Sequence, residues 1–208
     1  MNLPSIQVAN WDRARLARQW RAARPFPHLL FDPFVSEAAF TGLRKAARDE
    51  PLLVQADELY QFQGSAEPPA NETLRAFAEE LGSSAVREAL REITGLATSA
   101  VSLRVYRYGP GDYLLPHTDH RASQAEVNGE EERRLAFAFY LGDQPRGGAL
   151  QLYDCALDDN ALVRTRPAKR IAARPNRFAI FGVGPTSLHR VCELLEGERL
   201  SLAGWFLA

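Results

Sequence analysis

The second half of the chain is a series of short segments with strand-type composition, and this pattern most limits the fold. The segments are rich in β-branched and aromatic residues, with Gly, Pro, Asn and Asp between them. They occupy residues 100–108, 134–142, 148–154, 161–165, 169–173, 177–183, 188–194 and 199–208. Because they are short and evenly spaced, they favour an antiparallel sandwich, barrel or jelly roll over a parallel sheet with crossover helices.

The chain before residue 96 has mainly helical patterns. We expect helices over about 11–24 capped by Asn10, from Ser36 to about residue 48, from Asn71 to Gly82, and over about 84–94. Residues 25–35 are expected to be extended and residues 53–68 irregular. The pattern predicts one α+β domain over 1–208, with a helical part at about 10–95 and a strand core at about 96–208.

Composition bounds the class of protein. The formal net charge of −1 argues against binding nucleic acid through overall charge, although the arginine-rich segment 11–24 keeps that option open. The two cysteines, Cys155 and Cys192, form no CxxC motif, which favours a reducing compartment. The first twenty residues lack the apolar core of a signal peptide, and no apolar run approaches a membrane span. We therefore expect a soluble, cytoplasmic protein.

The segment 134–141 predicts a sheet with two different faces. Alternation puts Leu135, Phe137, Phe139 and Leu141 on one side, and Arg134, Ala136, Ala138 and Tyr140 on the other. The bulky side suits packing against helices or a second sheet. The side with two alanines and a tyrosine leaves room for a ligand, although ordinary core packing would also explain it.

His117 and Asp119 form an HxD pair after a Gly-Pro-Gly turn. At strand spacing their side chains point the same way, so an imidazole and a carboxylate converge. A firm metal site needs a third ligand, and His189, near the start of another predicted strand, is a candidate. Two histidines and one carboxylate would form the facial triad that suits iron(II) oxygenases. An HxD pair alone is common by chance.

Arg199 and Ser201 share one face of the last predicted strand, with Ala203 and Trp205. If that face points inward, the arginine needs an anionic partner, and its planar fork suits a carboxylate. The alternatives are a salt bridge to Glu193 or Glu196 and an exposed position. Considered alone, the strand favours those alternatives.

Taken together, the HxD pair, the distal histidine and an Arg-x-Ser about ten residues later resemble the 2-oxoglutarate and iron(II)-dependent oxygenases. Three segments resemble the prolyl hydroxylase branch: "YGPGDYLLPHTD", "RRLAFAFYL" with "GGALQLYD", and "NRFAIFGVGPTSLHRVCEL" with "RLSLAGWF". The segment "PFPHLLFDPFVSEAAFTGLR" resembles the start of the catalytic domain in ribosomal-protein prolyl hydroxylases of eukaryotes and their bacterial relatives. The resemblance spans about residues 25–206. The resemblance does not extend to the second, C-terminal barrel that the eukaryotic enzymes carry.

The resemblance implies a double-stranded β-helix, or jelly-roll, core with N-terminal helices packed on one sheet. It implies that His117, Asp119 and His189 hold Fe(II), and that Arg199, helped by Ser201, pairs with the distal carboxylate of 2-oxoglutarate. Tyr140 and Tyr108 match tyrosines that line the cosubstrate pocket. The implied cofactors are Fe(II), 2-oxoglutarate and O2, with ascorbate as an additional candidate.

The polar segment 120–133 allows two interpretations. It is either a solvated hairpin loop or a flap that orders over a polypeptide substrate, with His120, Arg121, Asn128 and Gly129 as candidate flap residues.

The leading hypothesis is a prolyl hydroxylase acting on a protein or peptide. The alternatives are the same chemistry on a small molecule, such as a free amino acid, and a non-catalytic jelly-roll metal-binding module. A nucleic-acid partner is disfavoured by the near-neutral charge and the lack of a base-stacking platform, and no membrane partner is expected.

Overall fold

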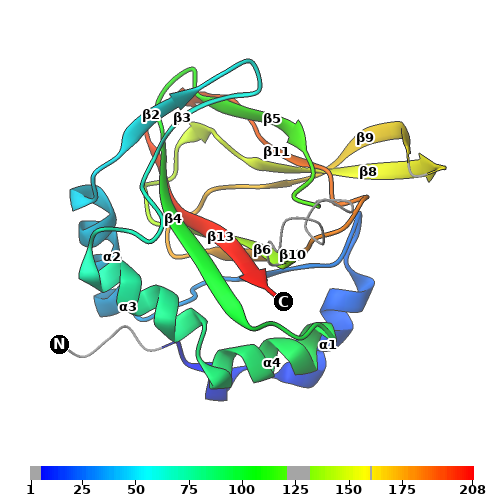
Figure 1. Cartoon of the computed structure of the whole chain (residues 1–208), viewed down its shortest axis with the longest axis horizontal. Coiled ribbons are helices and arrows are strands. Elements are labelled where there is room, and N and C mark those ends of the chain that lie inside the picture. The colour runs from blue at the N-terminus through cyan, green and yellow to red at the C-terminus, as the bar shows by residue number, and fades with distance from the viewer. Residues whose placement is uncertain (1–5, 121–131, 160) are drawn as a thin grey trace.

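The computed structural model describes residues 6–120, 132–159 and 161–208, which form a curled antiparallel sheet flanked by helices (Figure 1). The helices of these residues are η1 (Val8–Asn10), α1 (Arg13–Ala22), α2 (Glu37–Asp49), α3 (Glu72–Leu81) and α4 (Ser84–Thr94). The strands are β1 (His28–Phe31), β2 (Leu53–Ala56), β3 (Tyr60–Gly64), β4 (Ala100–Tyr108), β5 (Tyr113–His117), β6 (Arg133–Tyr140), β7 (Arg146–Gly147), β8 (Leu150–Asp158), β9 (Ala161–Ile171), β10 (Phe178–Gly182), β11 (His189–Val191), β12 (Leu194–Glu196) and β13 (Arg199–Leu207). Among these helices, none is both long and apolar enough to cross a membrane.

The main sheet runs in the order β1-β10-β6-β13-β4-β3-β5-β11-β8-β9, with β2 added beside β3. Adjacent strands in this sheet pair antiparallel. Their order in the sheet is far from their order in the sequence, as expected for a jelly roll. The sheet curls until its two ends meet, because Lys169 Nζ on β9 lies 2.7 Å from His28 Nε2 on β1. The predicted double-stranded β-helix is therefore confirmed.

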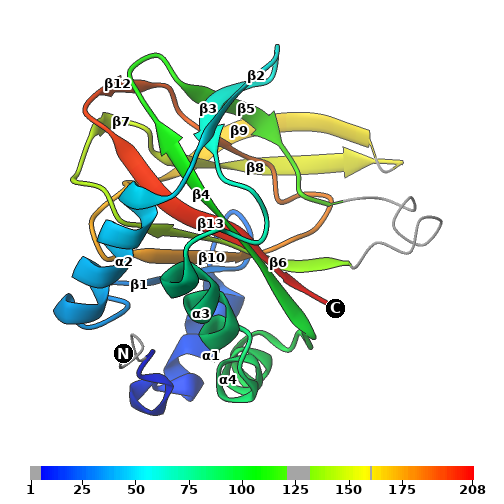
Figure 2. The same cartoon turned by 60° about the vertical axis from the view of Figure 1, so that its left-hand side comes forward.

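The helices cover one half of the curled sheet (Figure 2). Their main sheet contacts fall on β1, β4 and β13. The helix stripes, including Leu43, Phe77 and Ile93, form one core with Leu135, Phe137 and Phe139 of β6. The opposite face of β6 points into the barrel, where Ala136, Ala138 and Tyr140 belong to a second core with Leu152 and Phe181. Both predicted faces of this strand are confirmed.

Local signals explain where the helices begin and end. The side chains of Ser36 and Asn71 accept hydrogen bonds from Ala39 N and Thr73 N, so both act as the predicted N-caps. Gly95 ends α4 with a φ of +79°, a conformation that suits glycine. The cap of α1 differs from the prediction, because Asp12 accepts from Arg15 N while Asn10 lies in the preceding 3-10 turn.

Three strand predictions were wrong. The segment 188–194, expected to be one strand, is divided between β11 in the main sheet and β12, which pairs with β7 in a separate sheet. Residues 53–68, expected to be irregular, contain the β2–β3 hairpin, in which Leu53 pairs with Gly64 and Gln55 with Phe62. The segments 161–165 and 169–173, expected to be separate strands, form most of one strand, β9. Its register against β8 shifts twice, between Leu152 and Tyr153 and between Ala156 and Leu157. At the first shift Ala168 bulges, and Pro167 is accommodated inside the edge strand.

Gly204 provides a test of how closely the strands are packed. A Cβ at this position would lie 2.0 Å from the carbonyl oxygen of Ser102, which is backbone and cannot turn aside. Gly204→Ala should therefore lower the free energy of unfolding by about 1–3 kcal/mol, measured by urea denaturation. Gly42→Ala is the matched control. It adds the same methyl group inside α2, where nothing lies within 4 Å, and should raise stability by roughly 0.5–1 kcal/mol. Equal changes in the two variants would contradict this account.

Candidate functional site

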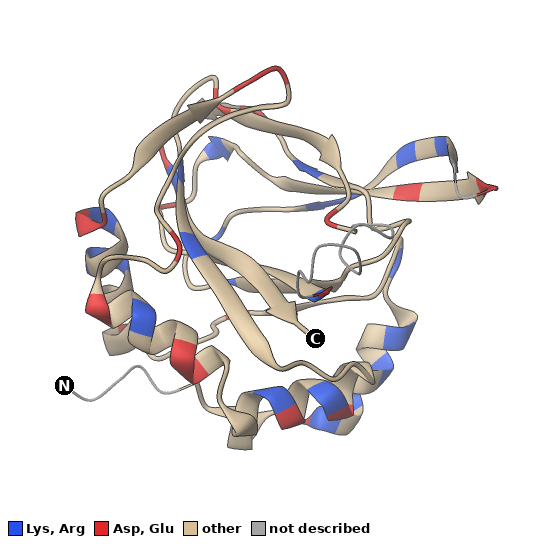
Figure 3. Cartoon of the chain, in the orientation of Figure 1, with Lys and Arg blue, Asp and Glu red and all other residues tan. Residues whose placement is uncertain are grey.

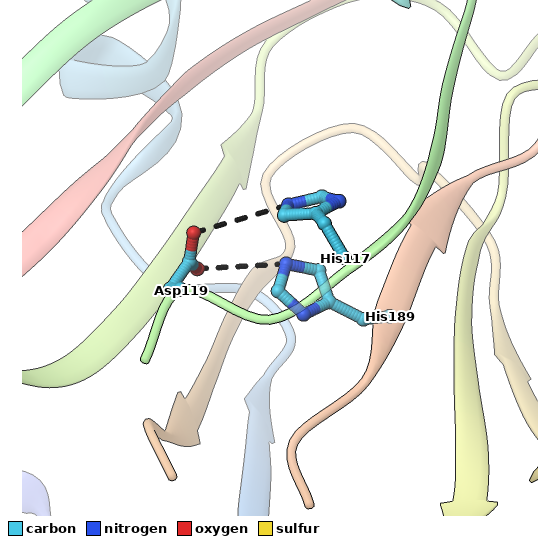
Figure 4. A group of neighbouring side chains, drawn as sticks. All are labelled: His117, Asp119 and His189. Atoms are coloured by element: carbon cyan, nitrogen blue, oxygen red, sulfur yellow. Dashed lines mark ion pairs between the residues drawn. The ribbon is translucent and has the colours of Figure 1, made fainter. Parts of the chain in front are cut away.

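A group of three side chains converges inside the barrel near the ends of β5 and β11. His117 and His189 are directly paired across these two strands, and their ring centroids are 4.3 Å apart. Asp119 follows β5 by two residues and points at both rings (Figure 4). Its Oδ1 lies 3.8 Å from His117 Nε2, and its Oδ2 lies 3.5 Å from His189 Nε2. The sequence-predicted triad is thus brought together in space.

The protonation of both imidazoles suits metal binding. His117 Nδ1 lies 2.8 Å from the carbonyl oxygen of Leu115, and His189 Nδ1 lies 2.9 Å from that of Ser187. A carbonyl can only accept, so Nδ1 carries the proton in each ring and Nε2 presents a lone pair to the centre of the group. One donor atom from each residue lies within 4.8 Å of the others, which is compatible with a single ion.

Burial sets the charge state of His189. Its side chain is 7% exposed, and desolvation lowers its pKa to about 4, although the Asp119 carboxylate opposes that shift. His189 is therefore neutral at pH 7, the form that can donate to a metal. The donor set of two imidazoles and one carboxylate fits a divalent first-row metal such as iron.

A cavity of about 500 Å³ extends from the triad into the barrel. Arg199 and Ser201 line it from β13, and Tyr108 lines it from β4. Tyr140 completes this group, since the Arg199 guanidinium carbon lies 5.2 Å from its ring and 4.8 Å from that of Tyr108. The four sequence-predicted cosubstrate residues therefore lie together.

Arg199 is buried, and none of the acidic residues that the structure describes pairs with it. It is 4% exposed, and no described acidic residue lies within ion-pair distance of it. Glu196 pairs instead with Arg146, and Glu193 is exposed. Arg199 Nε, Ser201 Oγ and Tyr140 Oη are buried and lack hydrogen-bond partners among the described residues. Burial also raises the pKa of Tyr108, so its hydroxyl stays protonated. This cluster of unmet donors suits a carboxylate ligand.

The cavity also contains residues that the sequence analysis did not identify. Arg133 stacks 3.6 Å over the Trp205 ring, and its Nη1 lies 3.7 Å from Asp119 Oδ1. Gln55, Tyr60 and Phe62 line the opposite side from the β2–β3 hairpin. The sequence did contain a signal for that hairpin. The turn residues Asp57 and Glu58 are followed by Tyr60 and Phe62, two aromatic residues at strand spacing.

The predicted flap lies mostly outside the described residues. Arg121, Asn128 and Gly129 belong to 121–131, so neither interpretation of that segment is tested. His120 is described, and its side chain is exposed rather than directed into the cavity.

Comparison with known proteins gives a consistent result. The chain is 30% identical over 219 residues to the mouse prolyl 3-hydroxylase OGFOD1, an alignment that covers 93% of this chain and 37% of that protein. The chain therefore spans little more than a third of this relative.

Two solved structures share the fold. A Pseudomonas putida prolyl-4-hydroxylase matches with a TM-score of 0.67 at 18% identity, covering 92% of this chain and 98% of that one. A Trichoplax adhaerens prolyl hydroxylase, in complex with a hypoxia inducible factor oxygen degradation domain peptide fragment, matches with a TM-score of 0.65 at 15% identity. That match covers 94% of this chain and 90% of the other.

The family model described as "2OG-Fe(II) oxygenase superfamily" matches residues 103–207, which contain the triad and the Arg199 cluster. That match covers half of the sequence, and the chain belongs to the 2OG-Fe(II) oxygenase superfamily.

Proposed function

We propose that this protein is a prolyl hydroxylase that acts on a protein or peptide. The observation that carries the proposal is that a His-Asp-His triad shares one cavity with a buried arginine that has no carboxylate partner among the described residues. The names of the relatives support prolyl hydroxylation, and the peptide bound to the Trichoplax enzyme supports a polypeptide substrate. We also propose that 1–208 acts as one domain, and that it works in the cytoplasm, where Cys155 and Cys192 would stay free as they are here.

In this proposal, His117, Asp119 and His189 hold Fe(II). Their Nδ1–H donations to backbone carbonyls fix each ring, so that Nε2 stays directed at the ion. Bound together, Fe(II), 2-oxoglutarate and O2 supply hydroxylation of a C–H bond coupled to conversion of 2-oxoglutarate into succinate and CO2.

Arg199 would orient the cosubstrate through its distal carboxylate, and Ser201 Oγ and Tyr140 Oη would add neutral donors. The Tyr108 and Tyr140 rings pack near the guanidinium and limit its positions. Apolar neighbours such as Leu150, Phe181 and Val191 exclude water from this part of the cavity, which strengthens the ionic contact.

The substrate would enter on the side of His117, whose side chain is 31% exposed, whereas that of His189 is 7% exposed. On this side Tyr106 and Trp205 line the cavity and offer apolar ring surfaces to a prolyl ring. Arg133 can donate to a backbone carbonyl of a polypeptide from its position over Trp205.

The first prediction concerns turnover. The anaerobically iron-loaded protein should form succinate from 2-oxoglutarate when supplied with denatured small proteins from a cell extract, and intact mass should show the gain of one oxygen. Asp119→Ala should abolish both signals, because it removes the only carboxylate of the triad. A responsive peptide should lose the effect when its target proline is replaced by alanine. Stimulation by only the small-molecule fraction would favour a small substrate, and absence of iron binding would overturn the assignment.

The second prediction separates cosubstrate binding from metal binding. Arg199→Gln should raise the KM for 2-oxoglutarate by roughly 10- to 100-fold, because it removes hydrogen bonds to a charged group. Its affinity for iron should remain unchanged. Arg199→Lys keeps the charge but loses the planar fork, so its KM for 2-oxoglutarate should lie between those of the unmodified protein and Arg199→Gln. Arg164→Gln, on exposed β9, is the matched control and should behave like the unmodified protein. Equal KM values in all four proteins would contradict the role of Arg199.

The third prediction concerns the metal-free protein. The pKa of His189 is lowered in the folded state, so the unfolded chain binds more protons between about pH 6.5 and pH 4. The free energy of unfolding should therefore fall as pH drops through this window, measured by urea denaturation at several pH values. His189→Asn should flatten that dependence. Burial lowers the pKa of His28 as well, so His28→Asn measures its share. A slope unchanged in His189→Asn would show that this imidazole is not buried in its neutral form.

A further inference from the structure

A second arginine, the half-buried Arg190, shares with Arg199 a buried Nε without a hydrogen-bond partner among the described residues, but lies on the outer face of the sheet. Five arginines have a buried Nε without a hydrogen-bond partner among the described residues: Arg44, Arg107, Arg134, Arg190 and Arg199. Three of them form ion pairs, Arg44 with Asp143, Arg107 with Glu198 and Arg134 with Glu132. Within the described ranges, Arg190 and Arg199 are left without a carboxylate.

Arg190 points away from the triad. It follows His189 on β11, and alternate residues of a strand face opposite sides, so its side chain lies on the outside of the barrel. The main helix contacts fall on β1, β4 and β13, in the other half of the sheet. Figure 3 shows basic bands on β9 and acidic bands on the neighbouring β8. Asp154 of β8 pairs with Arg166 of β9.

Strand pairing brings a second arginine to the same face. Arg190 pairs with Gln151 on β8, and Gln151 pairs with Arg170 on β9, so the two arginines flank one glutamine. Arg170 Nε donates to Gln151 Oε1 at 3.2 Å, and its Nη2 lies 3.8 Å from Cys192 Sγ. These contacts hold one edge of the guanidinium in place. No described carboxylate pairs with Arg170.

Tyr153 lies on the same face, two residues along β8 from Gln151. It is 7% exposed, and burial raises the pKa of its hydroxyl, which therefore remains a hydrogen-bond donor. Among the described residues, the ionisable groups that influence that pKa are Arg190, Cys192 and Arg170, none of which is a carboxylate. Two cations and a neutral donor thus meet where no described acid balances them.

Protection of a sheet edge does not account for this cluster. Cations on edge strands discourage pairing with other chains, which explains Arg164 and Arg170 on β9. Arg190, in contrast, lies on β11, which is hydrogen-bonded to β5 on one side and to β8 on the other.

We propose that Arg170, Arg190 and Tyr153 form an oxyanion-binding site on the outer face of β8, β9 and β11, which takes a phosphate or carboxylate group. Planar guanidinium groups suit both, because each anion offers paired acceptor oxygens. The site lies outside the cavity that holds the triad, and the inference does not depend on the proposed function.

The test is a titration of the full chain with inorganic phosphate, followed through the Nε–Hε signals of its arginines by nuclear magnetic resonance. The protein is loaded with zinc, which is diamagnetic, and 2-oxoglutarate is held at a fixed concentration, stoichiometric with the protein, to occupy the proposed cosubstrate site without competing in excess for the outer one. The Arg170 and Arg190 signals should shift and saturate, whereas sodium chloride of equal ionic strength should produce no saturating shift. A parallel titration with succinate distinguishes a carboxylate ligand from phosphate.

Variants make the test specific. In Arg190→Gln the dissociation constant, followed at Arg170, should rise about tenfold or more, because charge-assisted hydrogen bonds are lost. Tyr153→Phe should weaken binding less. Arg164→Gln removes an exposed β9 arginine outside the cluster and should leave the constant unchanged. Arg190→Lys preserves the charge and carries the test if Arg190→Gln does not fold.

Shifts that never saturate with either anion, or equal weakening in Arg164→Gln and Arg190→Gln, would overturn the proposal. The Nε–Hε signals of Arg170 and Arg190 report on this site directly and require no turnover. The outcome of the titration therefore stands whether or not the protein is a hydroxylase.

Discussion

The pairing of β11 with β5 is the interaction on which the candidate site depends. It sets His189 opposite His117, although the two residues are far apart in the sequence. The same strands are held from outside by β3 and β8, so neither histidine depends on a free edge for its position. Asp119 lies just beyond β5, where the chain leaves the sheet and its carboxylate can reach both rings. Rigid pairing thus supplies two donors and a short extension supplies the third.

Strand alternation explains how much of this arrangement could be predicted. On β6, bulky apolar side chains pack toward the helices, while Ala136, Ala138 and Tyr140 point into the barrel. On β13, Leu200, Leu202 and Phe206 pack against the helices, while Arg199, Ser201 and Trp205 line the cavity. A period of two is readable from sequence, so the two faces of β6 and of β13 were predictable, with Arg199 and Ser201 on the same face. The period alone did not show that this face points inward. That Arg199 has no acidic partner among the described residues was not predictable either, because Glu193 and Glu196 lie equally near in sequence.

The parts that sequence did not reveal depend on contacts between distant segments. The β2–β3 hairpin is exposed along β2, with Leu53 at 75% and Val54 at 74%, so β2 has no buried face for a hydrophobic pattern to reveal. It is held by pairing of β3 with β4 and β5, which local propensity does not encode. The position of Arg133 could not be read from local sequence either, because it lies over Trp205 only since β6 and β13 are neighbours in the sheet. The convergence of Arg170 and Arg190 likewise needs the register of three strands.

The charges of the cavity indicate why an anionic cosubstrate suits it. Among the described lining residues, Asp119 contributes one negative charge, while Arg133 and Arg199 contribute two positive charges. Asp119 lies close to Arg133, which leaves Arg199 as the cation on the buried side. A divalent metal at the triad would add further positive charge inside a largely apolar barrel. A dicarboxylate spanning from the triad to Arg199 offsets both charges at once, and a neutral ligand would leave the arginine buried and uncompensated. The charges that line the described cavity therefore favour an anionic ligand on its buried side.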